Sequence, residues 1–421
     1  MEDTPITRAN PLASVIYHIV RHLESQSPVG TRRQRDAPYS CPLFVRYTYE
    51  YTRSQESRDV FLRTFFQSIR LSLEEDEVDL GNEQVETGLR SALFDFADYL
   101  LDNFFLPCML IGRYSSLDWP HLKKTPKPSP AYHSAIQRAQ GAGSLQGSVG
   151  TPERVSALRG ACLVRDRHRC VISRRFDFDE ALERIETHGD GARDDDGVLF
   201  SEDTSPMITL EVAHILPHSL TKADPSAQLD PSREAALSIL NSFDTGIAYL
   251  IEGAEIDRPR NVITLTHFLH QLFSDFRIFF KAVPDQQPHT YHIGTFLPRH
   301  LMRDPHLPVT RTLYLADSRA TDAPLPRLFA VHYAIAHILH LCAAGDYIDT
   351  ILRDADEHGV RADGSTELGR LVRLGLEQWT DLTMWYIDEK KAAHRFDGLR
   401  EYDQSKAANW SYMLEGVELV P

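Results

Sequence analysis

Four polar residues between positions 214 and 270 have types and spacing that suit joint chemistry. His214 ends the apolar run MITLEVAH, and Asn261 opens the run NVITL. His267 and His270 follow, and because they are three positions apart they share one face of a helix. Imidazole changes charge near neutral pH and also binds metals. A single histidine of this kind is more often structural than functional. Histidines placed at the junctions of successive strands and a helix are a less common arrangement.

The elements that would position these residues are two strands and a helix. MITLEVAHILP is a β-type run ended by a proline, and Asn261 to Leu265 predict a strand that leads directly into the helix HFLHQLFSDF. RIFFKAV and YHIGTF predict a hairpin over 277–296, joined by the polar turn PDQQPHT. SREAALSILNSF predicts a helix with Ser232 as its cap.

Helical patterns flank this centre. Apolar residues recur at three- and four-residue spacing in DVFLRTFFQSIRLSL and VETGLRSALFDFADYLLDNFF, and the tail run RLFAVHYAIAHILHLCAAG predicts a helix ending at Gly345. A stretch rich in proline, lysine, glycine and serine predicts a flexible linker. The expected organisation is a helical N-terminal region (1–112), a linker (113–153), a central domain (154–300) and a helical C-terminal region (301–421).

Charge is distributed unevenly around position 176. Residues 154–175 hold seven arginines and one acidic residue, whereas 176–206 hold eleven acidic residues and two arginines. The acidic stretch predicts a flexible insertion. Such a run is usually a solvated loop, and the alternative is that it competes with phosphate for the neighbouring arginines.

Composition excludes a wholly disordered, a collagen-like and a membrane-embedded chain. With 42% hydrophobic and 25% charged residues over 421 positions, the chain is expected to be globular, in two to three packed units. Its net charge of −15 means that nucleic acid would be bound through a local patch. No secretory signal and no membrane span is visible, so we expect a soluble, intracellular protein of the nucleus or cytoplasm.

These residues resemble the HNH endonucleases, and more specifically the fungal proteins that contain an AH-type HNH domain. The resemblance runs from about Arg154 to about Phe296. It rests on RDRHRCVIS at 165–173, LEVAHILPHSL at 210–220, ILNSF at 239–243 and NVITLTHFLHQLF at 261–273. The three-letter signature maps onto His214, Asn261 and His270, and the nine-residue step between the last two is the spacing that the family uses.

The resemblance implies a ββα-metal fold that cradles one divalent ion. It implies that His214 is the general base that takes a proton from water, that Asn261 holds the loop after the first strand, and that His270 is a metal ligand. It also implies a nucleic-acid substrate. Phosphate contacts are then expected from a group of arginines, Arg165, Arg167, Arg169, Arg174 and Arg175.

The sequence departs from better-known HNH patterns at two places. Ala213 stands where an acidic residue or histidine often binds the metal, so Glu211, on the same side of the strand, is our first candidate for the second ligand. Asp275 and His267 are weaker candidates. Ser173 follows Cys170 where a C-x-x-C pair would need a cysteine, so no structural zinc is expected. The expected cofactor is Mg²⁺ or Mn²⁺, with Zn²⁺ or Ni²⁺ as alternatives.

Three functional hypotheses follow. The first is a metal-dependent endonuclease that hydrolyses phosphodiester bonds in DNA. The second is an inactive or weakly active HNH module that binds DNA or protein, which Ala213 and the acidic insertion favour. The third makes the helical regions the main functional part, as protein-binding surfaces. In each case the fold class is α+β, with a central ββα unit, an added hairpin and helical flanks.

Overall fold

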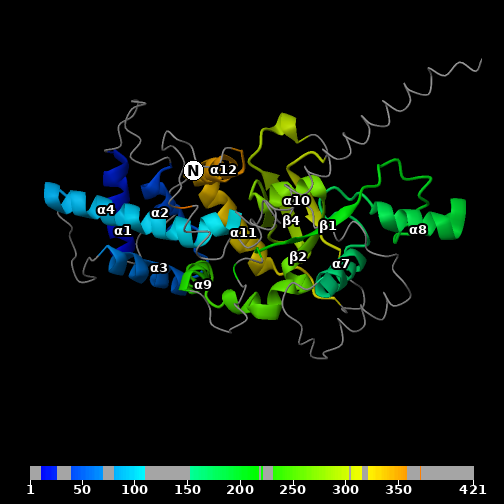
Figure 1. The fold of residues 1–421 in the computed structure, drawn as a ribbon, viewed down its shortest axis with the longest axis horizontal. Coiled ribbons are helices and arrows are strands. Elements are labelled where there is room, and N and C mark those ends of the chain that lie inside the picture. The colour runs from blue at the N-terminus through cyan, green and yellow to red at the C-terminus, as the bar shows by residue number, and fades with distance from the viewer. Residues whose placement is uncertain are drawn as a thin grey trace, which may run out of the picture. The chain divides into compact units, whose positions relative to one another are not determined.

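The computed structural model describes residues 11–25, 39–69, 80–109, 152–217, 220, 231–302, 305–314, 321–357 and 370. Contact density divides the chain into the units Met1–Thr366 and Glu367–Pro421, and every element named below belongs to the first. Its helices are α1 (Pro11–Ser25), α2 (Cys41–Glu50), α3 (Gln55–Ser68), α4 (Glu83–Leu100), α7 (Pro152–Arg165), α8 (Phe178–His188), α9 (Pro231–Phe243), α10 (His267–Ser274), α11 (Pro326–Leu341) and α12 (Ala344–Glu357). Its strands are β1 (Leu210–His214), β2 (Val262–Thr266), β3 (Ile278–Ala282), β4 (Thr290–Thr295) and β5 (Val309–Thr312). The predicted α+β class is confirmed (Figure 1).

Helices α1 to α4 pack around a core of phenylalanines. Phe61 and Phe65 of α3 meet Phe96 of α4, and the ring centroids of Phe65 and Phe96 are 5.4 Å apart. Ser54 and Asn82 cap α3 and α4 by accepting backbone N–H groups. The two amphipathic helices that the apolar spacing predicts here are therefore present, as α3 and α4.

Strands β1 and β2 form an antiparallel pair that leads straight into α10. His214 lies opposite Val262, and Glu211 lies opposite Leu265. Every residue of β2 is buried, with α7 and α10 both in contact with the pair (Figure 1). The strand begins at Val262, one residue later than expected, because Asn261 ends the 3-10 turn Pro259–Asn261.

A second, three-stranded sheet has the order β3-β4-β5. The predicted hairpin is present as β3 and β4, and β5 adds a strand that the sequence analysis did not predict. Gly294 of β4 is required by close approach, since a Cβ atom there would lie 2.5 Å from the ring of Phe279. The sheet packs on α11, where the rings of Phe280 and Phe329 stack with centroids 4.7 Å apart.

Helix α11 joins the second sheet to the N-terminal helices. Tyr333 of α11 lies near Tyr51, which ends α2, with ring centroids 6.2 Å apart. The helix ends at Leu341, before the predicted stop at Gly345, because Ala343 adopts a left-handed conformation (φ 61°) and Gly345 already belongs to α12.

In the parts of the chain that are described, no helix taken alone is long and apolar enough to cross a membrane. The bent pair formed by α11 and the first part of α12 reaches that length and apolarity together, by composition only.

The expected domain limits are partly outside the described residues. Of the predicted linker 113–153, only positions 152 and 153 are described, and they begin α7. Contacts cross the expected limits: the N–H of Arg53 donates to the carbonyl of Phe243 at 2.8 Å, and the rings of Phe104 and Phe243 are 5.7 Å apart. The limits themselves stay a prediction.

The acidic stretch 176–206 contains an ordered helix, contrary to the expectation of a flexible insertion. Asp177 caps α8 by accepting the N–H of Glu180. A small core of Phe176, Ala181, Ala192 and Phe200 holds the following turns against the helix. The glycines and aspartates that suggested flexibility form turns, and ion pairs to the preceding arginines stabilise them.

Candidate active site

His214, the last residue of β1, lies beside a buried carboxylate. Its Nε2 is 3.3 Å from Oδ1 of Asp257, which ends the 3-10 turn Gly253–Asp257. The Asp257 side chain is 1% exposed and that of His214 is 18% exposed, so the imidazole stays accessible while its partner is enclosed. A carboxylate at this position favours a proton on Nε2, which places the basic lone pair of the neutral ring on Nδ1.

Asn261 fixes the loop that follows His214. Its side-chain Oδ1 accepts the N–H of Leu216 at 3.0 Å, and its Nδ2 donates to the carbonyls of Leu216 and Ile256, each at 3.1 Å. Its own carbonyl accepts the N–H of Ile215 at 2.7 Å. Asn261 is fully buried, so an apolar substitute would leave several backbone groups without partners.

Arg165 is buried and internal, which corrects the expectation that it contacts phosphate. Its Nε and Nη2 donate to the two oxygens of Asp166 at 2.8 Å, and its side chain is fully enclosed. It also donates to the carbonyls of Pro259 and Val262, the residues on either side of the segment that contains Asn261. Arg165 therefore stabilises that segment, and its side chain is not accessible to a nucleic acid in this structure.

Glu211 joins the two histidines of α10. Its Oε1 is 2.9 Å from Nδ1 of His267, and its Oε2 is 2.8 Å from Nδ1 of His270. Partial burial alone would raise the pKa of Glu211, but hydrogen bonds and charge from His270 and His267 outweigh it, so that the pKa is lowered. The carboxylate thus orients both rings from the neighbouring strand.

His270 offers one ring nitrogen to a divalent ion, and Glu211 is the carboxylate that orients its ring. In the described part of the chain, no three or more histidine, cysteine, aspartate or glutamate side chains converge as a complete metal site would. Because Nδ1 of His270 is bonded to Glu211, a metal would take Nε2, an arrangement common among metal-binding histidines. The donors fit an ion held by one or two protein groups and completed by substrate oxygens and water.

Of the two weaker ligand candidates, His267 contacts Glu211 and Asp275 lies at the other end of α10. Asp275 is the C-cap of α10, at the end opposite His267, and its N–H bonds the carbonyls of Gln271 and Phe273. All five cysteines are buried and outside any disulfide, and Cys170 Sγ accepts the N–H of Ser173 at 3.4 Å.

The remaining predicted arginines have different acidic and backbone partners, although Arg167 and Arg174 both lie over the ring of Tyr314. Arg167 and Arg169 are paired with acidic residues of the 176–206 stretch. Arg174 lies against β5, where it donates to the carbonyl of Thr312 and stacks over the ring of Tyr314 at 4.2 Å. Arg175 is half-buried in the same loop. Burial lowers the pKa of Arg174, as desolvation disfavours its charge.

Two antiparallel strands and a helix thus place one histidine at a strand end and two histidines on the helix. Residues 170–281 match the family model described as HNH endonuclease, so the resemblance predicted from the sequence is confirmed for this segment. The match includes His214, Asn261 and His270 and covers just over a quarter of the 421 residues. No curated protein matches the chain, and no solved structure matches it. The fungal subgroup stays a prediction.

Sequence reasoning missed Asp257 and Asp166. Asp257 lies four positions before Asn261 in a polar turn, and its spacing from His214 is 43 residues, so no periodic pattern links the two. Asp166 is adjacent to Arg165 in an arginine-rich run, where it was counted only as an acidic residue. Asp166 is the lone carboxylate of its basic run, which is a signal, whereas Asp257 lies close to Glu252 and Glu255, so the sequence does not single it out.

Proposed function

We propose that this protein is a metal-dependent HNH endonuclease that hydrolyses phosphodiester bonds in DNA, with His214 as the general base. The observation that supports it best is the pairing of His214 with the buried Asp257 at the point where Asn261 fixes the following loop. A base must be oriented and accessible, and this arrangement provides both.

The proton transfer would proceed at Nδ1 of His214. With the Nε2 proton shared with Asp257, the Nδ1 lone pair takes a proton from the attacking water, and the imidazolium that forms is stabilised by the carboxylate. Asn261 keeps the backbone after His214 in place during this step. Arg165, paired with Asp166, stabilises Asn261 through the neighbouring carbonyl of Val262. Arg165 and Asn261 are thus positioning residues.

His270, oriented by Glu211, would hold the divalent ion, with Mg²⁺ or Mn²⁺ favoured by the few protein donors. When bound, such an ion neutralises the scissile phosphate and favours departure of the leaving oxygen. Among the predicted phosphate contacts, Arg167 is one-third exposed and Arg174 and Arg175 are half-buried, so these three stay in the proposal while Arg165 leaves it.

The test is a plasmid-nicking assay with Mg²⁺, Mn²⁺, Zn²⁺ or EDTA. We expect metal-dependent nicking that is lost in His214→Ala and retained in His188→Ala, a matched change of an exposed histidine at the end of α8. Nicking that survives His214→Ala would place the base elsewhere. If the folded protein nicks the plasmid with none of the three ions, the proposed enzymatic function is refuted.

A second candidate is an HNH module that binds nucleic acid or protein without cleaving. The observation that favours it is that both carboxylate oxygens of Glu211 are engaged by imidazoles, while Ala213 offers no ligand. Titration calorimetry with Mn²⁺ separates the two candidates. The enzyme predicts binding that weakens in His270→Ala and Glu211→Gln, whereas the module predicts no ion binding in any of the three proteins.

A further inference from the structure

The three consecutive aspartates 194–196 are paired with the three consecutive basic residues 167–169. The pairs are Asp194 with Arg169, Asp195 with His168 and Arg184, and Asp196 with Arg167. Two of these cations, Arg167 and Arg169, are residues for which the sequence predicts phosphate contacts. Carboxylates therefore stand where phosphate oxygens were expected.

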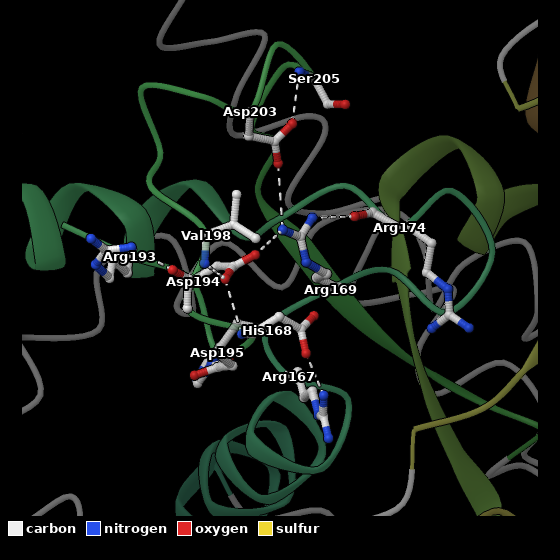
Figure 2. A network of polar contacts seen from close by, with 12 residues as sticks. Arg167, His168, Arg169, Arg174, Arg193, Asp194, Asp195, Val198, Asp203 and Ser205 are labelled. Atoms are coloured by element: carbon white, nitrogen blue, oxygen red, sulfur yellow. Dashed lines mark hydrogen bonds and ion pairs between the residues drawn. The ribbon is translucent and has the colours of Figure 1, made fainter.

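The innermost pair is a fixed anchor. Arg169 Nη2 lies 2.6 Å from Asp194 Oδ2, and the two side chains are 12% and 3% exposed. Asp194 Oδ1 also accepts the N–H groups of Asp196 and Val198, at 2.9 and 2.8 Å, so its side chain fixes the turn that follows. Arg169 donates in addition to the carbonyl of Arg174 at 2.6 Å (Figure 2). Neither partner of this pair is available to a ligand.

The outer pairs are less enclosed than the anchor. Arg167 and Asp196 are 34% and 38% exposed, and Asp195 is 29% exposed. Its partners His168 and Arg184 are 11% and 20% exposed, and both also meet Glu180. The Arg167–Asp196 pair is exposed enough to be weak and screened by salt, so a ligand of higher charge density can exchange with its carboxylate first. Asp195 accepts from His168 Nδ1 at 2.9 Å and from Arg184 Nη2 at 2.8 Å, bonds that a phosphate oxygen would also accept.

We propose that Arg167, His168 and Arg184 form a binding site for the phosphates of a nucleic-acid strand, and that Asp195 and Asp196 occupy this site in the free protein. The inference rests on the proposed function, because it assigns part of the substrate's path. Nucleic acid displaces the two outer aspartates while the Asp194 anchor keeps the turn attached. The acidic loop acts as a built-in competitor that lowers affinity for isolated phosphates and short strands.

The site is joined to the strand that contains His214. Asp177, the cap of α8, accepts the N–H of Leu210 at 2.9 Å, and Leu210 is the residue before Glu211. The N–H of Phe178 donates to the carbonyl of Ile208 at 3.3 Å. A nucleic-acid strand bound by Arg167 and Arg184 is therefore attached to the segment that leads into β1.

The experiment compares two double variants that remove the same charge. Asp195→Asn with Asp196→Asn frees the cations, whereas Glu183→Gln with Glu186→Gln changes exposed positions of α8. Binding of a labelled DNA duplex is measured in EDTA by fluorescence anisotropy across salt concentrations. We expect the aspartate variant to bind roughly tenfold more tightly at low salt, with a salt slope steeper by about 0.9 for each phosphate gained. We expect the glutamate variant to remain near the wild type.

Adding Arg167→Gln to the aspartate variant should cancel most of the gain, and circular dichroism checks that each variant is folded. Should the aspartate pair impair folding, Asp196→Asn alone addresses the more exposed pair. Equal affinity in the two double variants overturns the inference. Cleavage by the wild type without a gain in the aspartate variant leaves the proposed function and removes the inference. A gain of DNA affinity in the aspartate variant, with no cleavage by any variant, supports the binding site and removes the proposed enzymatic function.

Discussion

At the scale of single residues, the proposed base, His214, and the carboxylate that would orient it differ in exposure. His214 is accessible, Asp257 is enclosed, and the contact between them is 3.3 Å. Removing a general base from an enzyme commonly costs 10²–10⁴-fold in rate. Removing the orienting carboxylate leaves the base in place but frees the ring to change its tautomer.

Asp257→Asn tests this division. We expect plasmid nicking to fall, by less than the roughly 10²–10⁴-fold loss expected for His214→Ala, with the protein still folded. Single-turnover nicking rates measure the effect, and Asp190→Asn, at an exposed turn after α8, is the matched control. Full activity in Asp257→Asn would show that the carboxylate does not orient the base.

The sequence singles out candidate site residues where their order along the chain is distinctive. His214, Asn261 and His270 are recognisable because a strand, a turn and a helix impose their spacing. Asp257 is not, because its contact with His214 is made by tertiary structure alone. Arg165 illustrates the opposite problem, since an arginine in a basic run looks exposed until its burial against Asp166 is known.

At the scale of elements, buried polar pairs and packed rings join the two sheets to their helices. Arg165 of α7 reaches the carbonyls that flank Asn261, and His332 of α11 stacks on Phe273 of α10 with centroids 4.0 Å apart. The β2–α10 junction was predictable from local pattern. Strand β5 was not, because it is a short edge strand that depends on its pairing with β4.

Arg165→Met should destabilise the protein strongly. The substitution leaves the carboxylate of Asp166 buried without its cation, a change that typically costs about 3–5 kcal/mol. Urea unfolding at pH 7 measures the free energy of unfolding. Arg167→Met, in a pair that is one-third exposed, should cost about 1 kcal/mol or less. Similar losses in the two variants would contradict the bracing role of Arg165.

His332 should make stability depend on pH. Its burial lowers the pKa to about 3, although the Nε2–H bond to the carbonyl of Phe273 acts in the opposite direction. The unfolded chain binds a proton below its ordinary pKa of 6.5 and the folded protein does not, so stability is complete above that pH and falls as the pH drops toward 3. The slope from this group is at most about 1.4 kcal/mol per pH unit.

The measurement is urea unfolding between pH 7 and pH 4 for the wild type and His332→Phe, which keeps the stacked ring. We expect a shallower loss of stability with acid in the variant, while His300→Phe, at an exposed position, keeps the wild-type slope. Parallel curves for the wild type and His332→Phe would show that the histidine is not held neutral.

At the scale of the whole molecule, the segment that matches the HNH family lies within a larger packed unit. Asp244, just after α9, accepts from Arg53 at 2.9 Å and from two nitrogens of Arg327, at 3.0 and 2.7 Å. Arg53 follows α2 and Arg327 belongs to α11, so one carboxylate joins three parts of the chain. Phe243 beside it contacts Phe104 and Phe105.

A chain shortened to residues 150–357 should therefore be less stable than the full protein, although it retains the entire matched segment 170–281. Loss of the N-terminal helices exposes the buried faces of α9 and α11, including Phe243 and Tyr333, to water. Each fully buried large apolar side chain contributes about 1.5–3 kcal/mol, so the loss of several such contacts is comparable with the whole stability of a domain. Thermal unfolding followed by circular dichroism measures the effect. An unchanged melting temperature would show that the HNH segment folds independently and would favour the domain limits that the sequence suggested.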